Sequence, residues 1–504
     1  MIRRSRSAQW ATIFMSVPFT ALAQQQLVTR DGRPMPMGTP GVTQPLTPDQ
    51  IARENPPNAL SGAAIDKPVV LKGIGGMSIR VVKLAEGLSH PDGLVFLPDG
   101  KTMLITERAG RLRVVKDGLL DPNPVPGVPA MDHVALGGLQ DIALHPNFSK
   151  NHLLYLSYSK NREPQLGTTL AIARARFEQG RLTDVKDILV TDAWESPLGT
   201  YGGRMVFGPD GMLYISVGDR DGTTSNDISS ARPKAQSLTS HIGKILRVRD
   251  DGSIPSDNPF VNDPKAKGEI YTLGHRNVYG IAWDPKSGKM WTSEFGPAGG
   301  DEINREIAGH NYGWPLVSLG RNYSGHLVSD QPWHRDGMDD PAYYWNPTFN
   351  PENMFFYTGD KFPPLKGGLL VAGASKRIAQ MIVREDDFVR QGGSMLEELN
   401  VRFRDIRQGP DGDIYVLTEG RLRDQRTRMA CCCGLNRQAW REQPHAIDTS
   451  VPMSFGAAKP AFNAVGGGRR RRISGPGRGK LRRLSELSAT RTQQPFGSLP
   501  SDID

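Results

Sequence analysis

The sequence feature that most constrains the fold is a repeated pair of alternating apolar runs joined by a turn of the Pro-Asp-Gly type. Proline fixes φ at the start of such a turn and glycine supplies the positive φ at its end, so each repeat is predicted to be a β-hairpin. The repeats occupy residues 93–107, 141–159, 204–219, 280–295 and 405–420, and residues 367–383 form a further pair with a different turn.

About six hairpins fall within residues 63–420, and helical periodicity is almost absent between them. Many short strands in repeated hairpins favour a closed all-β array. We therefore predict an all-β fold, a six-bladed β-propeller over residues 63–420. A β-sandwich is the structural alternative, but it does not explain the recurrent Pro-Asp-Gly turn.

The N-terminal residues have the pattern of an export signal. Three arginines precede an apolar stretch over residues 10–23 that ends in Ala21-Leu22-Ala23. This predicts a signal peptide over residues 1–23 and a periplasmic or secreted protein. A membrane anchor is the weaker alternative, because the stretch falls short of about 20 apolar residues and no later segment is long enough to span a bilayer. Residues 24–62 are rich in Pro, Gln and Thr and are predicted to be a linker.

The charge of the chain is concentrated at its C-terminal end. The formal net charge is +9, but residues 421–504 hold 16 of the 62 basic and 6 of the 53 acidic residues, which leaves a net charge of −1 for residues 1–420. The body therefore has no nucleic-acid signature. All three cysteines are adjacent at 431–433 and lack the spacing of a zinc site. We predict that residues 421–504 form a basic, disordered tail.

Chemically active residue types gather in "LGHRNVYGIAWDP" (273–285) and "SEFGPAGGDEINREIAGHNYGWP" (293–315). Propellers place functional loops on one mouth of the central channel, and "GHRN" precedes a blade's inner strand while "EFGPAGGDEIN" follows it, so both can reach the same mouth. Carboxylates and the free carbonyls of a Gly-Pro turn are hard oxygen ligands suited to Ca²⁺, and Arg276 could bind a carboxylate in a bidentate fork. The alternative is that Asp301 and Glu302 only cap a turn and that Arg276 pairs with one of them.

The stretch from about residue 88 to 420 resembles the soluble aldose sugar dehydrogenases that depend on pyrroloquinoline quinone (PQQ), in the glucose/sorbosone dehydrogenase family. The motifs that carry the resemblance are "GGLQDIALHPNF", "YGGRMVFGPDGMLYISVGDRDG", "LGHRNVYGIAWDP", "EFGPAGGDEINREIAGHNYGWP", "YYWNPTFNPENMFFYTGDKFP" and "RFRDIRQGPDGDIYVLT". The resemblance implies a six-bladed propeller with PQQ and Ca²⁺ at one mouth. It also implies oxidation of an aldose at its C1 hydroxyl to a lactone, with a quinone or cytochrome as electron acceptor, by an exported monomer or homodimer.

The resemblance also implies roles for individual residues. Arg276 and Asn277 match residues that bind the acidic edge of the quinone, and the carbonyls of Gly296 and Pro297 match those that hold its Ca²⁺. A second calcium position of part of the family is matched by Glu302 and Tyr312. Further cofactor contacts are matched by Tyr323, Lys376, Arg402 and Arg404.

Two positions depart from the family. Where its members have the histidine that acts as general base, in the pattern H-aromatic-G-G-R, this chain reads "TYGGR", with Thr200 in that place. A threonine hydroxyl is too weak a base near neutral pH. A cofactor-contacting glutamine of the family is replaced by Leu136. The candidates for a substitute base are His90, Asp92, Tyr201 and a bound water.

Three functions remain open on this sequence. The first is a PQQ-dependent dehydrogenase that works with a substitute base. The second is a propeller that binds calcium and the quinone without turnover. The third is a calcium-dependent lactonase, which would need a cage of Asn, Asp and Glu that the sequence does not display.

Overall fold

The computed structural model describes residues 67–131, 136–162, 167–196, 199–221, 230–419 and 430–437, the last range in backbone only. The predicted signal peptide (1–23) and linker (24–62) lie outside the described residues, as does the predicted tail apart from 430–437. The chain divides into two compact units, Met1–Trp440 and Arg441–Asp504, and every described residue belongs to the first. In the described part of the chain, no helix is both long and apolar enough to cross a membrane.

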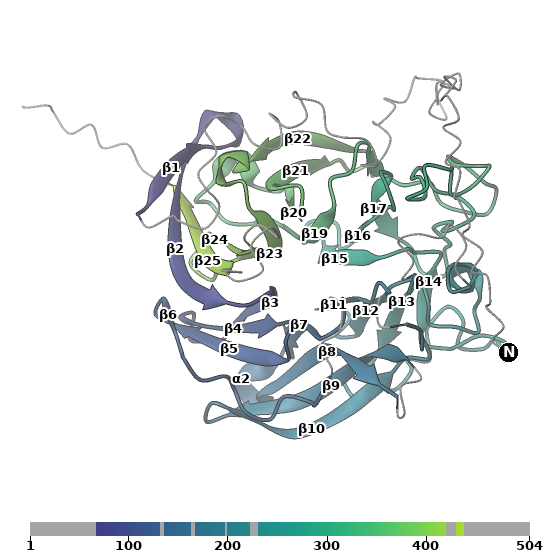
Figure 1. Ribbon diagram of the computed structural model, residues 1–504, viewed down its shortest axis with the longest axis horizontal. Helices are drawn as coiled ribbons and strands as arrows, with labels where there is room; N and C mark the ends of the chain where they lie inside the picture. Colours follow the sequence, from purple (N-terminus) through teal and green to yellow (C-terminus); the bar gives the residue numbers. More distant parts are fainter. Residues whose placement is uncertain are drawn as a thin grey trace, which may run out of the picture. The chain divides into compact units, whose positions relative to one another are not determined.

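The described strands form six antiparallel sheets (Figure 1). Five of them have four strands each: β3 (Pro91–Phe96), β4 (Thr102–Glu107), β5 (Arg111–Lys116) and β6 (Leu119–Leu120); β7 (Leu139–Leu144), β8 (Leu153–Asn161), β9 (Thr168–Glu178) and β10 (Arg181–Val190); β11 (Gly202–Phe207), β12 (Leu213–Val217), β13 (Lys244–Val248) and β14 (Ile270–Leu273); β15 (Val278–Trp283), β16 (Met290–Glu294), β17 (Asp301–Glu306) and β18 (Tyr343–Trp345); β19 (Pro351–Phe356), β20 (Leu369–Gly373), β21 (Arg377–Val383) and β22 (Val389–Met395). The short helices are α2 (Phe148–Asn151), η1 (Ile74–Gly76), η2 (Arg232–Gln236), η3 (Pro363–Leu365) and η4 (Glu397–Leu399).

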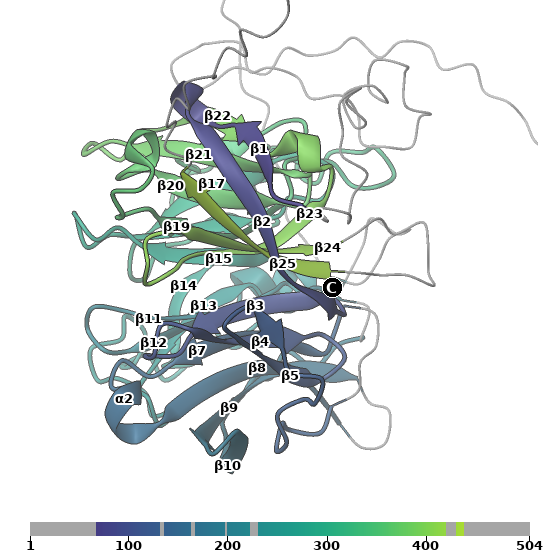
Figure 2. The same cartoon turned by 90° about the vertical axis from the view of Figure 1, so that its left-hand side faces the viewer.

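The remaining sheet is composite and has five strands (Figure 2). Its order is β1 (Val69–Lys72), β2 (Ser78–Leu88), β25 (Ala430–Arg437), β24 (Ile414–Glu419) and β23 (Arg402–Gln408). Strand β25 pairs with both β2 and β24, so residues from the two ends of the described chain meet in one sheet. Residues 430–437, which the sequence prediction placed in the tail after residue 420, therefore pair with the propeller as a strand that contains the cysteine run 431–433.

One strand of each sheet, which we call its first strand, takes part in a closed ring, and β23 is the first strand of the composite sheet. Strand β3 contacts β7, β7 contacts β11, β11 contacts β15, β15 contacts β19, β19 contacts β23, and β23 returns to β3 (Figure 1). This arrangement confirms the predicted all-β propeller. Five of its sheets are regular four-stranded blades of consecutive strands, whereas the composite sheet departs from that pattern.

Five predicted hairpins correspond to the first two strands of a sheet: β3–β4, β7–β8, β11–β12, β15–β16 and β23–β24. The hairpin predicted at 367–383 is instead β20–β21, the second and third strands of its sheet. The first strand of that sheet, β19, has no Pro-Asp-Gly signal, because a longer connection that contains η3 joins it to β20.

Hydroxyl groups in the second strands tie neighbouring sheets together. Each first strand has a register shift near its start, and such a bulge leaves a backbone amide without a ladder partner. Ser157 Oγ accepts a hydrogen bond from the amide of Asp141 in its own sheet (2.9 Å) and donates to the carbonyl of Gly203 in the next sheet (2.6 Å). Equivalent bridges are made by Thr106, from Gly93 to Gln140, and by Ser216, from Arg204 to Val278.

Replacing one of these hydroxyls should destabilise the whole unit. We expect Ser157→Ala to lower the free energy of unfolding by about 2 kcal/mol or more, because it leaves a buried amide and a buried carbonyl without partners. Chemical denaturation of the purified protein measures this change. The exposed Ser256 provides the matched control, and Ser256→Ala should stay within about 0.5 kcal/mol of the wild type. Equal effects of the two substitutions would contradict the bridging role.

Candidate functional site

The loops named in the sequence prediction meet at one end of the ring, which we call the loop end. The amide of Asp219, after β12, donates to the carbonyl of Arg276, before β15, at 2.6 Å. The amide of Phe295, after β16, donates to the carbonyl of Asn277 at 3.1 Å, and the Asn277 side chain accepts from the amide of Gly202 at 3.1 Å. Residues before the first strands and after the second strands therefore share this end, as predicted.

The Arg276 side chain is buried beside the Gly-Pro turn. Its Nη1 donates to the carbonyls of Phe295 (3.1 Å) and Gly296 (3.0 Å), and its guanidinium lies 5.4 Å from the centre of the Trp314 ring. Burial would lower the pKa of Arg276, but Asp219 and the neighbouring Tyr323 outweigh it and raise that pKa. The Nε of Arg276 is buried and has no hydrogen-bond partner among the described residues. The side chain therefore keeps its charge and one unused donor.

The backbone of Arg276 is fixed by a buried histidine and two carboxylates. Glu294 accepts from the Arg276 amide at 2.7 Å and lies 3.2 Å from Nδ1 of His275. His275 Nε2 lies 3.5 Å from Glu306, and its ring stacks on Tyr312 at 4.8 Å. Burial alone would lower the pKa of His275, but Glu306 and Glu294 raise it to about 10. The imidazolium and its carboxylates thus set the position of the Arg276-Asn277 pair.

The acidic residues after the Gly-Pro turn have separate tasks. Asp301 is fully buried and accepts hydrogen bonds from the amides of Gly296, Phe349 and Asn350, so it caps the turn as the alternative interpretation proposed. Arg276 pairs with neither Asp301 nor Glu302 in this arrangement, since its Nη1 binds carbonyls. Burial, followed by the charge of Glu294, raises the pKa of Glu302 to about 8.

The predicted second calcium pair is not assembled as an evident metal site. The Tyr312 hydroxyl donates to the carbonyl of Arg305 and accepts from the amide of Ile307, so the backbone occupies it. Glu302 contacts the side chain of Asn304 at 3.1 Å. Over the described ranges, no group of three or more His, Cys, Asp or Glu side chains could hold a metal ion. The Gly296 carbonyl, one of the two carbonyls predicted to hold Ca²⁺, accepts the hydrogen bond from Arg276 described above.

Arg402 and Arg404 form a second cationic group on β23. Arg402 Nε donates to Glu352 at 2.9 Å, and Arg404 lies 3.5 Å from the same carboxylate oxygen. Arg404 also binds Glu419 at 2.5 Å, and His90 lies 2.9 Å from Glu419. Sequence reasoning missed Glu352, although "NPEN" places it at the start of β19. These carboxylates hold the two arginines side by side.

Tyr279 lies close to both cationic groups. Its ring packs edge-on against Phe295 at 5.2 Å, and burial raises the pKa of its hydroxyl, with the charge of Arg108 acting against that rise and those of Asp92 and Glu352 adding to it. Arg108, a further cation that the sequence prediction omitted, binds Asp92 at 3.0 Å and has a buried Nε without a partner among the described residues. Donors left unused in buried guanidinium groups fit an anionic ligand.

The other predicted cofactor residues lie at the same end. Tyr323 is 44% exposed and lies beside the Arg276 guanidinium, where its hydroxyl helps to raise the Arg276 pKa. Lys376 occupies the left-handed position (φ 69°) of the turn between β20 and β21. That turn is attached to the loop before β19 by a hydrogen bond from the Ala374 amide to the Asn350 carbonyl. Leu136, in place of the family's glutamine, is exposed.

The two residues at the expected catalytic position differ in their surroundings. Tyr201 is fully buried, with its hydroxyl bonded to Thr168 and its ring 3.6 Å from the guanidinium carbon of Arg220. It is therefore part of the packing behind the site. The Thr200 hydroxyl instead donates to Asp219 Oδ1 at 2.6 Å. The sequence contains Asp219 in "SVGDRDG", but its pairing with Thr200 follows from the fold and was not predicted.

These observations define a β-propeller whose loop end gathers buried arginines suited to an anionic ligand. The chain belongs to the Glucose / Sorbosone dehydrogenase family, whose model matches residues 88–425. Membership in this family of sugar dehydrogenases confirms the resemblance found in the sequence.

Individual relatives agree with this family. The chain is 36% identical over 344 residues to aldose sugar dehydrogenase YliI of Escherichia coli (strain K12), covering 68% of this chain and 90% of that protein. It is 32% identical over 445 residues to quinoprotein glucose dehydrogenase B of Acinetobacter calcoaceticus, covering 74% and 88%. The PQQ-bound aldose sugar dehydrogenase of Streptomyces coelicolor has a TM-score of 0.55 and 25% identity, with 75% of this chain and 100% of that chain covered.

The loop that carries Thr200 should depend on Arg220. The Arg220 guanidinium is fully buried and donates to the carbonyls of Ala193 (3.2 Å), Gly199 (3.0 Å) and Thr200 (3.1 Å). We expect Arg220→Met to lower the free energy of unfolding by about 3 kcal/mol or more, since several buried carbonyls lose their donor. Arg390→Met, at an exposed arginine of β22, is the control. Denaturation curves that overlay for the two variants would disprove this role.

Proposed function

We propose that this chain is a PQQ- and calcium-dependent aldose dehydrogenase that oxidises the C1 hydroxyl of a sugar to a lactone. The observation that carries the proposal is the pair of cationic groups at the loop end, around Arg276 and around Arg402 and Arg404, which contains buried donors without partners in the described part of the chain. PQQ is an acidic quinone, and guanidinium groups are the side chains best suited to bind carboxylates in a fixed orientation. Family membership supplies the reaction class.

Each part of the site has a distinct task in this proposal. Arg276, Arg402 and Arg404 bind and orient the anionic cofactor, with Asn277, Tyr323 and Lys376 as further contacts. The carbonyls of Gly296 and Pro297 supply neutral oxygen ligands for Ca²⁺. When bound, the quinone supplies a two-electron acceptor for hydride and Ca²⁺ polarises its carbonyl. The sugar approaches from the loop end, where Tyr323 is exposed.

The proposal also covers the number of blades, the location of the protein, its electron acceptor and its oligomeric state. We propose that the composite sheet serves as the sixth blade, that the chain is exported to the periplasm or secreted, and that a quinone or cytochrome accepts the electrons. A monomer or homodimer is consistent with a site built from one chain. Calcium at Glu302 and Tyr312 is a weaker element, because the Tyr312 hydroxyl is bonded to the backbone.

Cofactor binding can be tested without turnover. We expect purified apoprotein to bind PQQ in the presence of Ca²⁺, followed by titration of the quinone absorbance, and to reduce a dye when an aldose is added. Arg402→Met should weaken PQQ binding by about 10- to 100-fold, because a charged hydrogen bond contributes about 1.5–3 kcal/mol. Arg390→Met is the matched control and should bind as the wild type does. If neither variant loses affinity for PQQ, the assignment of this cationic site is contradicted.

The same titration distinguishes the alternatives. PQQ binding without aldose oxidation would favour a binding module, which the substitution of the family's histidine by Thr200 makes the second candidate. A protein that neither binds PQQ nor oxidises aldoses would be tested for lactone hydrolysis. If PQQ binds and the site geometry is that of the family, Thr200→His should raise the rate of dye reduction.

A further inference from the structure

The Thr200 hydroxyl and the Asp219 carboxylate form a buried pair at the place where a base is needed. Thr200 is 8% exposed and Asp219 is fully buried, and the Thr200 hydroxyl donates to Asp219 Oδ1 at 2.6 Å. A hydroxyl group that donates one hydrogen bond keeps two lone pairs with which it can accept another. Thr200 can therefore accept a proton on one side and release one on the other.

The other donors to Asp219 cannot exchange their protons in this way. Trp314 Nε1 donates to Oδ2 at 2.9 Å, and the amide of Asp221 donates to Oδ1 at 3.1 Å. Indole and amide groups hold their protons at any pH near neutrality, so the Thr200 hydroxyl is the exchangeable contact among those described. Burial raises the pKa of Asp219, with Arg276 and Thr200 acting against that rise. A carboxylate in such a setting is a stronger base than one in water.

The pair is held against the residues assigned to the cofactor. The Asp219 amide is bonded to the Arg276 carbonyl, and the amide of Gly202, two residues after Thr200, is bonded to the Asn277 side chain. Arg220 fixes the Thr200 carbonyl at 3.1 Å. The hydroxyl is thus positioned by the same contacts that position Arg276 and Asn277.

The substitute bases considered from the sequence are otherwise engaged. His90 pairs with Glu419 at 2.9 Å. Although burial raises it, the pKa of Asp92 is held below its usual value by Arg108, Arg404 and Arg204, which makes Asp92 a weak base. The Tyr201 hydroxyl is bonded to Thr168 in the buried layer behind the site. None of the three offers an arrangement comparable to that of Thr200 and Asp219.

We propose that Thr200 relays a proton from the sugar hydroxyl to Asp219 during oxidation. The proton of the sugar hydroxyl moves to Thr200 Oγ1 while the original Thr200 proton moves to Asp219 Oδ1. The sugar C–H bond breaks as hydride leaves with two electrons for the quinone, and a C=O bond forms. Asp219 becomes a neutral carboxylic acid, which returns its proton to solvent after product leaves. This inference rests on the proposed quinone-dependent function.

Three substitutions separate the relay from a purely structural pair. Thr200→Val keeps the shape of the side chain but removes the hydroxyl, Thr200→Ser keeps the hydroxyl, and Asp219→Asn keeps the shape but removes the basic group. We expect Thr200→Val and Asp219→Asn each to lower kcat about 100-fold or more, the usual contribution of a general base. Thr200→Ser should restore most of the rate. The double variant should be no slower than either single one, because the two residues act as one unit.

Readouts other than rate complete the test. Wild-type kcat should rise with pH through the ionisation of Asp219, and this limb should vanish in Asp219→Asn. In the apoprotein, infrared titration of the Asp219 carboxyl, assigned by difference against Asp219→Asn, should give a higher pKa in Thr200→Val, which loses a donor to the carboxylate. An unchanged infrared pKa, multiplicative rate losses, or full activity of Thr200→Val would overturn the relay.

Failure of the relay can be told apart from failure of the proposed function. PQQ titration of the same variants measures binding independently of proton transfer. Normal binding and turnover with full activity in Thr200→Val would overturn the relay alone, and normal binding without aldose oxidation would overturn both the relay and the dehydrogenase function. Absence of PQQ binding in the wild type would remove the cofactor and the relay together.

Discussion

The fold depends on hydroxyl groups that accept hydrogen bonds from the backbone amides freed by the bulges of the first strands. A bulge frees an amide inside the molecule, where an unpaired polar group costs about 1–3 kcal/mol. Ser157 and Ser216 avoid this cost by accepting a hydrogen bond from the freed amide, and each also donates to a carbonyl of the next sheet. Because the bulges lie near the loop end, the same contacts fix where the site loops begin. Stability and site geometry therefore share one set of hydrogen bonds.

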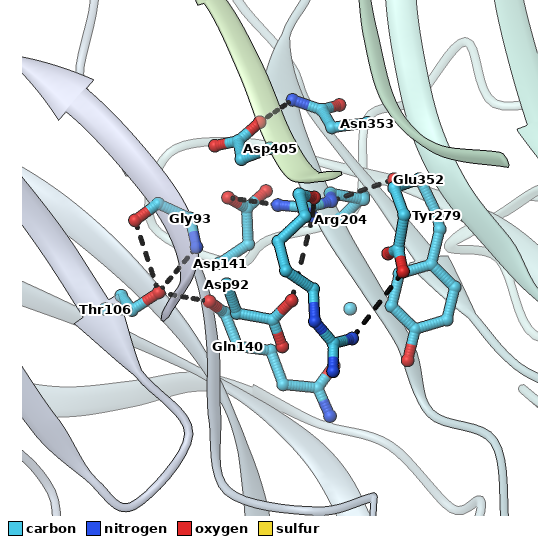
Figure 3. A network of polar contacts seen from close by, with 12 residues as sticks. Asp92, Gly93, Thr106, Gln140, Asp141, Arg204, Tyr279, Glu352, Asn353 and Asp405 are labelled. Atoms are coloured by element: carbon cyan, nitrogen blue, oxygen red, sulfur yellow. Dashed lines mark hydrogen bonds and ion pairs between the residues drawn. The ribbon is translucent and has the colours of Figure 1, made fainter. Parts of the chain in front are cut away.

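Charged side chains of the first strands form further contacts between neighbouring sheets. Arg204 donates to Asp141 at 3.1 Å and to the carbonyl of Tyr279 at 2.8 Å (Figure 3). It also donates to the carbonyl of Arg404 at 3.2 Å, so one side chain contacts three other first strands. Asp405 likewise accepts from Asn353 and from the amide of Leu94 across the closing junction. Removing one partner of such a buried pair leaves an uncompensated charge and costs about 3–5 kcal/mol. These pairs disfavour any other register between sheets.

Local patterns in the sequence predicted what is local in the structure. The Pro-Asp-Gly turns identified five hairpins, and the loop sequences placed Arg276, Asn277 and Gly296 together, because both depend on neighbouring residues. Strand β25 was missed, since its pairing partners β2 and β24 supply the reason for its extended form and its own composition does not. The Thr200–Asp219 contact was missed for a similar reason: the two residues are brought together by the β11–β12 hairpin and the loops packed on it. A turn can be predicted from the residues of one segment, whereas a contact between two polar side chains can be predicted only when the positions of both segments are known.

Arg276 links the metal and cofactor parts of the proposed site. Its Nη1 donates to the carbonyl of Gly296, which is also a proposed ligand of Ca²⁺. Two cations cannot approach one carbonyl oxygen closely without strong repulsion in a buried setting. In the proposed site, a calcium ion at that carbonyl would weaken its contact with Nη1, and a guanidinium released from this contact would favour an anion as its partner. An acidic quinone bound there would be such an anion, so in the proposed site metal binding and cofactor binding would favour each other through the Arg276 side chain.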